Sequence, residues 1–332
     1  MQVRVMKSII HAKLSALTCE HWLMLLALAL FILALRCPTG RGVTFTSRDD
    51  VVSCVPLTGH CGLRLSEDSS SYFPVRRIVD ETYLQSLERR LIGHFNRSGF
   101  SLIRPSGCDP AYRTAIVVPY RDRAEHLNLF VQHIHDFLAG QGIAYALYVI
   151  EQSKGDPFNR GMLFNVGFRE ALKDAGNFCC FIFHDVDLLP ENPQNAYVCS
   201  SQPRHMCVGI DTFRYVVPYA NIFGGVVAMQ RQHVEKVNGF SNRFWGWGGE
   251  DDDLALRIRL CGLTIFRWPP HISRYTMMGH KKEMPNPDRF ALLAESEAKW
   301  RRDGLSDLRY EVLAIHRNPL FTRITVRLHR NT

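Results

Sequence analysis

The chain has 332 residues, of which 46% are hydrophobic and 22% are charged, so it can bury a substantial core. This composition excludes a disordered or fibrous protein. The formal net charge of +8 would suit nucleic acid, but the basic residues are scattered and no nucleic-acid-binding motif accompanies them. We therefore expect no nucleic-acid partner; phosphate-bearing small molecules or an anionic membrane surface fit the charge as well.

The N-terminal region carries a membrane-targeting pattern. An uncharged apolar run spans residues 22–35 and follows Arg4, Lys7 and Lys13. A cleaved signal peptide is the alternative, because 14 residues are few for a span. No clean cleavage site follows, and thin early-secretory bilayers accept short spans. We therefore expect a cytoplasmic tail over 1–21, a signal anchor over 22–36 and a lumenal remainder.

The cysteines agree with a lumenal location. There are ten of them, which suits an oxidising compartment, and none forms a zinc-like pair. Asn96 begins a usable N-glycosylation sequon, which has meaning only in the lumen. Residues 37–71 are rich in Pro, Gly, Ser and Thr without periodicity, which is typical of a stem. The folded domain is expected over 72–332.

The first half of that domain alternates between strand and helix patterns. Runs rich in β-branched and aromatic residues predict strands over 115–120, 145–150 and 178–183, and helical patterns at 124–138 and 162–173 separate them. This order predicts an α/β fold with a mainly parallel sheet. Ligands of such sheets bind at the carboxyl ends of the strands.

Two aspartates follow the third predicted strand directly. Asp185 and Asp187 lie two residues apart, so in extended backbone both face one ligand or one divalent ion. The alternative is a pair of solvated turn aspartates. Met277 and His280 add a thioether and an imidazole from a distant loop, and the three donor types together suit Mn2+. Without the two aspartates, Met277 and His280 would be interpreted as a packing methionine and a surface histidine.

Arginines accompany the other predicted strand ends. Arg121 and Arg123 follow the first strand, and Phe158 and Arg160 precede the second helix. A guanidinium donates two parallel hydrogen bonds and therefore suits a diphosphate. Taken singly, each motif is also consistent with ordinary surface arginines.

The stretch FWGWGGEDDD over 244–253 combines glycines, tryptophans and four carboxylates. Glycines permit backbone angles closed to other residues, and an indole is a flat plate that stacks on sugar rings. We interpret Trp247 as part of a mobile lid over a carbohydrate. The carboxylates include a candidate general base, or they only favour the first turn of a helix predicted over 251–259.

Together these motifs resemble the β1,4-galactosyltransferase family of Golgi glycosyltransferases. The resemblance covers roughly Cys108 to Thr325 and includes FNRGMLFNVGF, FHDVDLLPEN, FGGVVAM, NGF, WGWGGEDDD and RYTMMGH in the family's order. It implies a catalytic domain with a GT-A fold, a Rossmann-like mixed, mainly parallel sheet flanked by helices. It also implies a Mn2+-dependent inverting reaction with a UDP-sugar donor and a terminal GlcNAc acceptor, at the Golgi membrane.

The resemblance also implies roles for single residues. The metal ligands are Asp187, Met277 and His280, and the nucleotide contacts are Arg121, Arg123, Phe158, Arg160 and Asp185. Asp251 resembles the catalytic base, with Glu250 beside it. Ile222, Gly225 and Trp247 match donor contacts. The acceptor set is Trp247, Gly248, Gly249, Asp252, Arg289, Phe290 and Leu293. Cys180 and Cys199 match one family disulfide, and Cys108 matches half of another, whose partner here is Cys54 or Cys61.

One position separates donor sugars. Galactose-transferring members typically have Tyr before FGG, where this chain has Ile222. Isoleucine lacks the hydroxyl and leaves room for an N-acetyl group, which predicts transfer of GalNAc from UDP-GalNAc; transfer of galactose from UDP-Gal is the alternative, with Ile222 as a neutral apolar replacement. A carbohydrate-binding protein without turnover is less consistent with the sequence, because every implied metal ligand and the base are present. A nucleotidyltransferase would give no reason for the tryptophan lid.

Overall fold

The computed structural model describes residues 43–45, 63–65, 72–94, 101–105, 110, 112–174, 177–280 and 283–330. The apolar run over 22–35, Asn96 and Cys108 lie outside these residues. No helix in the described part of the chain is both long and apolar enough to cross a membrane. Strand β1 (Val43–Phe45), within the predicted stem, pairs in parallel with β9 (Ile265–Arg267) and so belongs to the same unit as the rest of the described chain.

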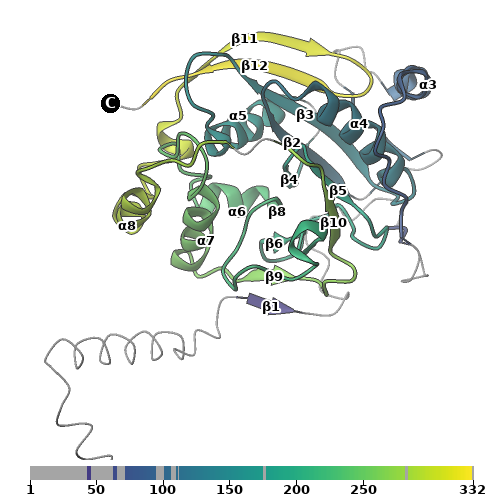
Figure 1. The fold of residues 1–332 in the computed structure, drawn as a ribbon. Coiled ribbons are helices and arrows are strands. Elements are labelled where there is room, and N and C mark those ends of the chain that lie inside the picture. The colour runs from purple at the N-terminus through teal and green to yellow at the C-terminus, as the bar shows by residue number, and fades with distance from the viewer. Residues whose placement is uncertain are drawn as a thin grey trace, which may run out of the picture. The chain divides into compact units, whose positions relative to one another are not determined.

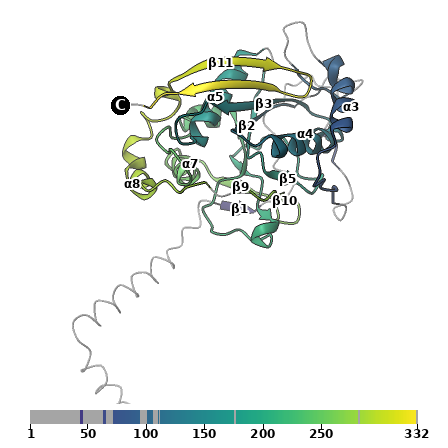
Figure 2. The ribbon, with the colours of Figure 1, turned by 45° about the horizontal axis from the view of Figure 1, so that its top comes forward.

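A nine-stranded mixed sheet forms the centre of this unit. Seven strands run in one direction, and only β8 and the edge strand β11 are antiparallel to their neighbours. Figure 2 shows the β11–β12 hairpin along one edge. The spatial order is β1, β9 (Ile265–Arg267), β6 (Arg204–His205), β8 (Val226–Gln230), β4 (Cys180–His184), β2 (Arg113–Tyr120), β3 (Ala144–Gln152), β12 (Thr322–Leu328) and β11 (Tyr310–Arg317).

Helices cover both faces of the sheet (Figure 1). Side chains of β2 alternate between two apolar clusters, because successive strand residues point to opposite faces. Ile116 and Val118 pack with α3 (Glu81–Leu91) and α4 (Ala124–Ala139). Ala115 and Val117 pack with the opposite group, α5 (Arg160–Lys173), α6 (Arg231–Lys236) and α7 (Glu250–Leu260). Helix α8 (Arg289–Lys299) packs beside α7.

The sequence-predicted elements are confirmed. The three predicted strands are β2, β3 and β4, and the three predicted helices are α4, α5 and α7, each with bounds within two residues of the prediction. A mainly parallel sheet flanked by helices is therefore present, as the GT-A assignment requires.

A second sheet of three short strands and three short 3-10 turns were not predicted. The sheet consists of β5 (Leu188–Pro190), β10 (Arg274–Met277) and β7 (Gly209–Ile210), in that order. The 3-10 turns are η2 (Ile92–His94), η3 (Asp211–Phe213) and η4 (Leu305–Asp307). Because β5 directly follows the Asp185–Asp187 turn, its antiparallel partner β10 is brought to the end of β4.

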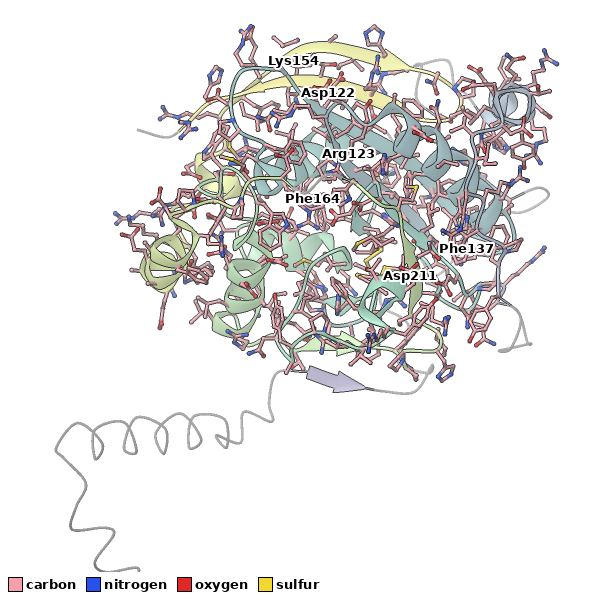
Figure 3. All side chains as sticks on the ribbon, in the orientation of Figure 1. Asp122, Arg123, Phe137, Lys154, Phe164 and Asp211 are labelled. Atoms are coloured by element: carbon pink, nitrogen blue, oxygen red, sulfur yellow. A yellow bond between two sulfur atoms is a disulfide. The ribbon has the colours of Figure 1, made fainter. Side chains whose placement is uncertain are left out.

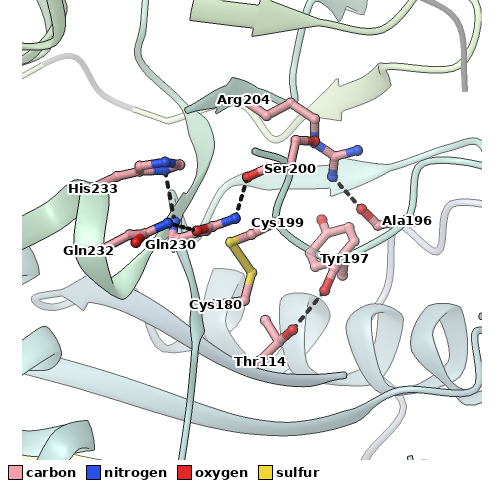
Figure 4. The surroundings of a disulfide bond; sticks show 10 residues. All are labelled: Thr114, Cys180, Ala196, Tyr197, Cys199, Ser200, Arg204, Gln230, Gln232 and His233. Atoms are coloured by element: carbon pink, nitrogen blue, oxygen red, sulfur yellow. Dashed lines mark hydrogen bonds between the residues drawn. A yellow bond between two sulfur atoms is a disulfide. The ribbon is translucent and has the colours of Figure 1, made fainter. Parts of the chain in front are cut away.

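A disulfide ties the loop after β5 to the central strands (Figure 4). It joins Cys180 and Cys199, the pair that the family resemblance implies. Beside it, the Thr114 hydroxyl donates to the Tyr197 carbonyl at 2.9 Å. On the other side, the Gln230 amide donates to the Ser200 carbonyl at 2.8 Å. The loop is thereby held at the amino ends of β2 and β4, the edge of the sheet opposite the one that carries the candidate site.

Candidate active site

The site begins where β2 and β4 end side by side. The two strands are parallel neighbours, so their carboxyl ends reach the same edge of the sheet. Arg123 lies just after β2 (Figure 3), and its Nη1 is 3.2 Å from Asp187 Oδ2, just after β4. The structure therefore brings one arginine and one aspartate of the predicted set together at a shared edge.

The small sheet brings the other predicted metal ligands to Asp187. In the register of β5 with β10, Met277 lies opposite Leu188, and the Met278 amide donates to the Asp187 carbonyl at 2.8 Å. His280 Nδ1 lies 2.9 Å from Asp187 Oδ2. Burial by itself would raise the pKa of Asp187, but the hydrogen bond with His280 and the neighbouring charges outweigh it and lower that pKa.

These residues fit a divalent ion through their donor chemistry. Asp187 offers oxygen, His280 nitrogen and Met277 sulfur, a mixed set that suits Mn2+. In the parts of the chain that the structure describes, no three His, Cys, Asp or Glu side chains are grouped to hold a metal. The predicted set contains only two residues of those types and depends on a thioether for its third donor.

Arg160 joins two further carboxylates. Its Nε donates to Asp185 Oδ1 at 2.6 Å, and its Nη1 donates to Glu250 Oε1 at 3.2 Å. Its side chain lies over the Phe164 ring, 4.6 Å from the centroid. Burial raises the pKa of Glu250 to about 7, helped by the charge of Asp251 and opposed by Arg160. Burial likewise raises the pKa of Asp185 to about 6.

Asp251 lies in the first turn of α7, against the loop that precedes β8. A methyl group added to Gly224 would lie 2.4 Å from Asp251 Oδ2, so backbone and carboxylate are in close contact. Burial raises the pKa of Asp251, and the charge of Asp252 adds to this effect. A carboxylate with a raised pKa is a stronger base than an ordinary one, which suits the predicted role.

The four consecutive carboxylates divide between two functions. Glu250, Asp251 and Asp252 line the candidate site. Asp253 is fully buried and accepts a 2.5 Å hydrogen bond from Arg257 Nε, one turn further along α7. Asp252 Oδ1 accepts a 2.9 Å hydrogen bond from the Tyr219 hydroxyl. Tyr219 was missed by the sequence analysis. The only feature of the sequence that could have indicated Tyr219 is its position three residues before Ile222.

The loop over 244–249, which carries Trp247 and is called the tryptophan loop below, has the backbone conformation that its glycines predict. Gly246, Gly248 and Gly249 have φ values of +91°, +101° and +99°, in the region that favours glycine. Trp247 is 60% exposed, and its amide donates to the Met284 carbonyl at 3.1 Å. The tryptophan loop is thus hydrogen-bonded to the segment that leads into α8.

The predicted acceptor residues lie on that adjoining segment. The Arg289 guanidinium is 5.8 Å from the centroid of the Trp247 ring and 4.6 Å from that of Phe290. Phe290 is 69% exposed, and Leu293, one turn further along α8, is half-buried. An open surface of two aromatic rings and an arginine therefore adjoins the carboxylates of α7.

The remaining predicted donor contacts border the same region. Arg121 lies 5.2 Å from the centroid of the Phe158 ring and donates to the Asp156 carbonyl. Ile222 is half-buried at the end of the loop before β8. The Gly225 carbonyl accepts hydrogen bonds from the Asp185 amide and from Arg160 Nη2.

Comparisons with known proteins agree with this geometry. Residues 78–200 match the N-terminal region of glycosyl transferase group 7, and residues 204–281 match the N-terminal domain of galactosyltransferase. Beta-1,4-galactosyltransferase 3 of Homo sapiens is 49% identical over 226 residues, which are 67% of this chain and 57% of that protein. Beta-1,4-galactosyltransferase 4 of Homo sapiens is 47% identical, over 67% of this chain and 65% of that protein.

Two solved structures resemble the chain throughout their length. The catalytic domain of Drosophila beta1,4galactosyltransferase 7 in complex with xylobiose has a TM-score of 0.57 and 29% identity, over 66% of this chain and 95% of that one. A mutant of that enzyme, in complex with manganese, UDP-Gal and xylobiose, has the same TM-score and 30% identity, over the same shares. The chain spans between 57% and 65% of the length of the two human relatives above.

Proposed function

Because the chain belongs to the β1,4-galactosyltransferase family, we propose that it is an inverting glycosyltransferase that moves GalNAc from UDP-GalNAc to the 4-hydroxyl of a terminal β-GlcNAc. One observation carries the proposal. The Asp187–His280 donor pair, the buried Arg160 with its two carboxylates, and Asp251 meet at one edge of the sheet, next to an exposed tryptophan.

The residues of the site suit an in-line displacement. A Mn2+ ion held by Asp187, Met277 and His280 would supply positive charge opposite the diphosphate leaving group. Arg123 and Arg160 line the same edge and suit binding of that group. Asp251 accepts the proton of the attacking 4-hydroxyl while the sugar–phosphate bond breaks on the opposite face. The anomeric configuration is thereby inverted without a covalent intermediate.

The loops around the site suit an ordered reaction. The tryptophan loop and the segment before α8 are hydrogen-bonded through Trp247, Met284 and Asn286, so they are expected to move together. Closure over a bound donor would exclude water that would otherwise hydrolyse it, and would complete the acceptor surface.

The choice of GalNAc rests on Ile222, which has no hydroxyl for the donor's 2-position. The alternative donor is UDP-Gal, which a relative of known structure binds. The test is transfer by the full-length protein to a GlcNAc-terminated acceptor, with Mn2+ and each donor in turn, for wild type and Ile222→Tyr. GalNAc transfer that shifts toward galactose in the variant supports the proposal. Preference of the wild type for UDP-Gal overturns the donor assignment.

A variant that lacks the proposed base distinguishes an enzyme from a carbohydrate-binding protein. Asp251→Asn removes the base and keeps the shape, so it is expected to bind donor and acceptor but to transfer at a rate lower by about 100-fold or more. A wild type that binds both substrates and transfers from neither donor would favour the binding protein.

We further propose that the protein is a single-pass type II protein of the Golgi membrane with its catalytic domain in the lumen. The basic residues before the run over 22–35 support this orientation, and the Cys180–Cys199 disulfide suits an oxidising compartment. Protease protection of residues 72–332 in sealed vesicles tests it; digestion from the outside overturns it.

A further inference from the structure

A buried arginine lies directly behind the donor-selecting residue. Arg267, in β9, is only 2% exposed, and in the described ranges it has no ion pair with a carboxylate. Its Nη2 donates to the Ile222 carbonyl at 2.6 Å, and its Nη1 donates to the Ala220 carbonyl at 3.0 Å. Burying a cation without a counter-charge is costly, so its hydrogen bonds to this loop are the evident compensation.

Two further buried side chains extend the contact along the same loop. Arg267 and His205 lie opposite each other in β9 and β6, and Arg267 Nε donates to His205 Nδ1 at 3.1 Å. Since Nδ1 accepts, the neutral ring carries its proton on Nε2, which lies 3.4 Å from Cys207 Sγ. The Cys207 thiol donates to the Gly224 carbonyl at 3.2 Å and accepts from the Val226 amide at 3.0 Å.

Arg267 and Cys207 hold the backbone at every second residue from 220 to 226, and His205 links the two side chains. The loop before this point is largely exposed, with backbone hydrogen bonds that are mostly local. The held stretch contains Ile222, it contacts Asp251 through Gly224, and it contacts Asp185 and Arg160 through Gly225. A small shift of this stretch would therefore move the donor-selecting side chain relative to the rest of the site.

We propose that Arg267, His205 and Cys207 form a positioning network that sets donor-sugar specificity by fixing the backbone of residues 220–226. The inference rests on the proposed function and deepens it. Specificity requires that Ile222 be held to within a fraction of an ångström, which a loop residue achieves only through such support. None of the three side chains needs to touch the donor.

The test compares Arg267→Lys with Arg204→Lys. Arg204 is the matched control: it is also fully buried and donates to a backbone carbonyl, that of Ala196, but among the described residues its side chain makes no hydrogen bond to residues 220–226. As neighbours in one strand, Arg204 and His205 point to opposite faces. Arg267 reaches the two carbonyls and the imidazole with three different nitrogens, whereas lysine has all its donors on one nitrogen and cannot reproduce this spacing. Thermal unfolding and circular dichroism measure the folding cost of both variants.

The decisive readout is the ratio of kcat/KM for UDP-GalNAc to that for UDP-Gal. We expect Arg267→Lys to change this ratio at least fivefold and to raise the KM for the donor, while Arg204→Lys keeps the ratio within twofold of wild type. Affinity for UDP alone, measured by calorimetry, is expected to remain near wild type in both variants. A folded Arg267→Lys protein with the wild-type ratio overturns the inference.

Cys207→Ala provides a second and milder test in case Arg267→Lys does not fold. It leaves the Gly224 carbonyl and the Val226 amide without their thiol partner, so we expect the ratio to change at least twofold. An unchanged ratio in this variant overturns the inference. A wild type that binds neither UDP-sugar refutes the proposed function together with the network, whereas transfer with an unchanged ratio in every variant refutes the network alone.

Discussion

Adding a single methyl group at Gly224 should displace Asp251, the proposed catalytic base. In Gly224→Ala, the new Cβ would lie 2.4 Å from Asp251 Oδ2 and 3.3 Å from Asp251 Cβ and Cγ. Ordinary carbon–oxygen contact begins near 3.4 Å, so the carboxylate must move by about 1 Å. The displaced atoms belong to a side chain, so the helix that carries Asp251 can stay in place while the carboxylate turns away.

The structure sets the expected magnitude. A misplacement of about 1 Å can cost roughly 100-fold in rate, and a general base contributes about 10²- to 10⁴-fold. We therefore expect kcat to fall about 100-fold. Overpacking at this buried site is expected to lower the free energy of unfolding by about 1–3 kcal/mol. Steady-state transfer to a GlcNAc-terminated acceptor and thermal unfolding measure the two effects separately.

Two further variants bracket the result. Gly140→Ala is the control, since a methyl group there meets no atom within 4 Å and the backbone φ of −85° suits alanine. It should keep kcat within twofold of wild type. Asp251→Asn gives the rate without the base. If Gly224→Ala is folded and retains the wild-type kcat while Asp251→Asn does not, the position assigned to this carboxylate is wrong.

Three other predictions concern charge, stability and metal. Burial raises the pKa of Glu250 from 4.5 to about 7, so its contribution to stability is present at low pH and is lost as pH rises between these values. Glu250→Gln should therefore have the same free energy of unfolding as wild type near pH 4.5. At pH 8 the variant should be more stable, by at most about 3 kcal/mol. If denaturant titrations show the same dependence of this free energy on pH for both proteins, the pKa shift is contradicted. Asp303 accepts hydrogen bonds from Ser241, Asn242 and Arg257 in the core beneath α7. Asp303→Ala should therefore lower the free energy of unfolding, measured by urea titration, by about 3–5 kcal/mol. A loss below about 1 kcal/mol would show that other contacts can replace these. Chelation should abolish transfer, and His280→Ala should raise the Mn2+ concentration for half-maximal activity about tenfold or more; an unchanged value excludes His280 as a ligand.

Local pattern was sufficient for the central elements of the fold. Strands β2, β3 and β4 carry unbroken apolar runs, and α4 and α5 carry helical spacing, so each could be predicted from its own residues. The three-stranded sheet could not, because its strands have only two to four residues and show no periodicity. Its pairing depends on where the end of β4 places β5, and this sheet brings Met277 toward Asp187.

Local sequence pattern likewise predicts only part of the candidate site. Motif residues were recognisable because several occur together, as in the run that contains Glu250 and Asp251. Tyr219 and Arg267 are single residues whose partners lie 33 and 45 positions away, in Asp252 and in the Ile222 carbonyl. No spacing in the sequence marks such pairs. They become visible only when the loop before β8 is seen against α7 and β9.

The ion pairs of the candidate site explain why a metal would assist its arginines in binding a diphosphate. Arg160 is already paired with Asp185 and Glu250, and Arg123 is paired with Asp187. A diphosphate that took over either guanidinium would leave a buried carboxylate without compensation, which costs several kcal/mol. A Mn2+ ion held by Asp187 would replace the positive charge that this carboxylate loses when Arg123 turns to the diphosphate. The proposed metal ligands therefore suit a donor site in which Arg123 and Arg160 contact the diphosphate and Asp251 is the proposed base.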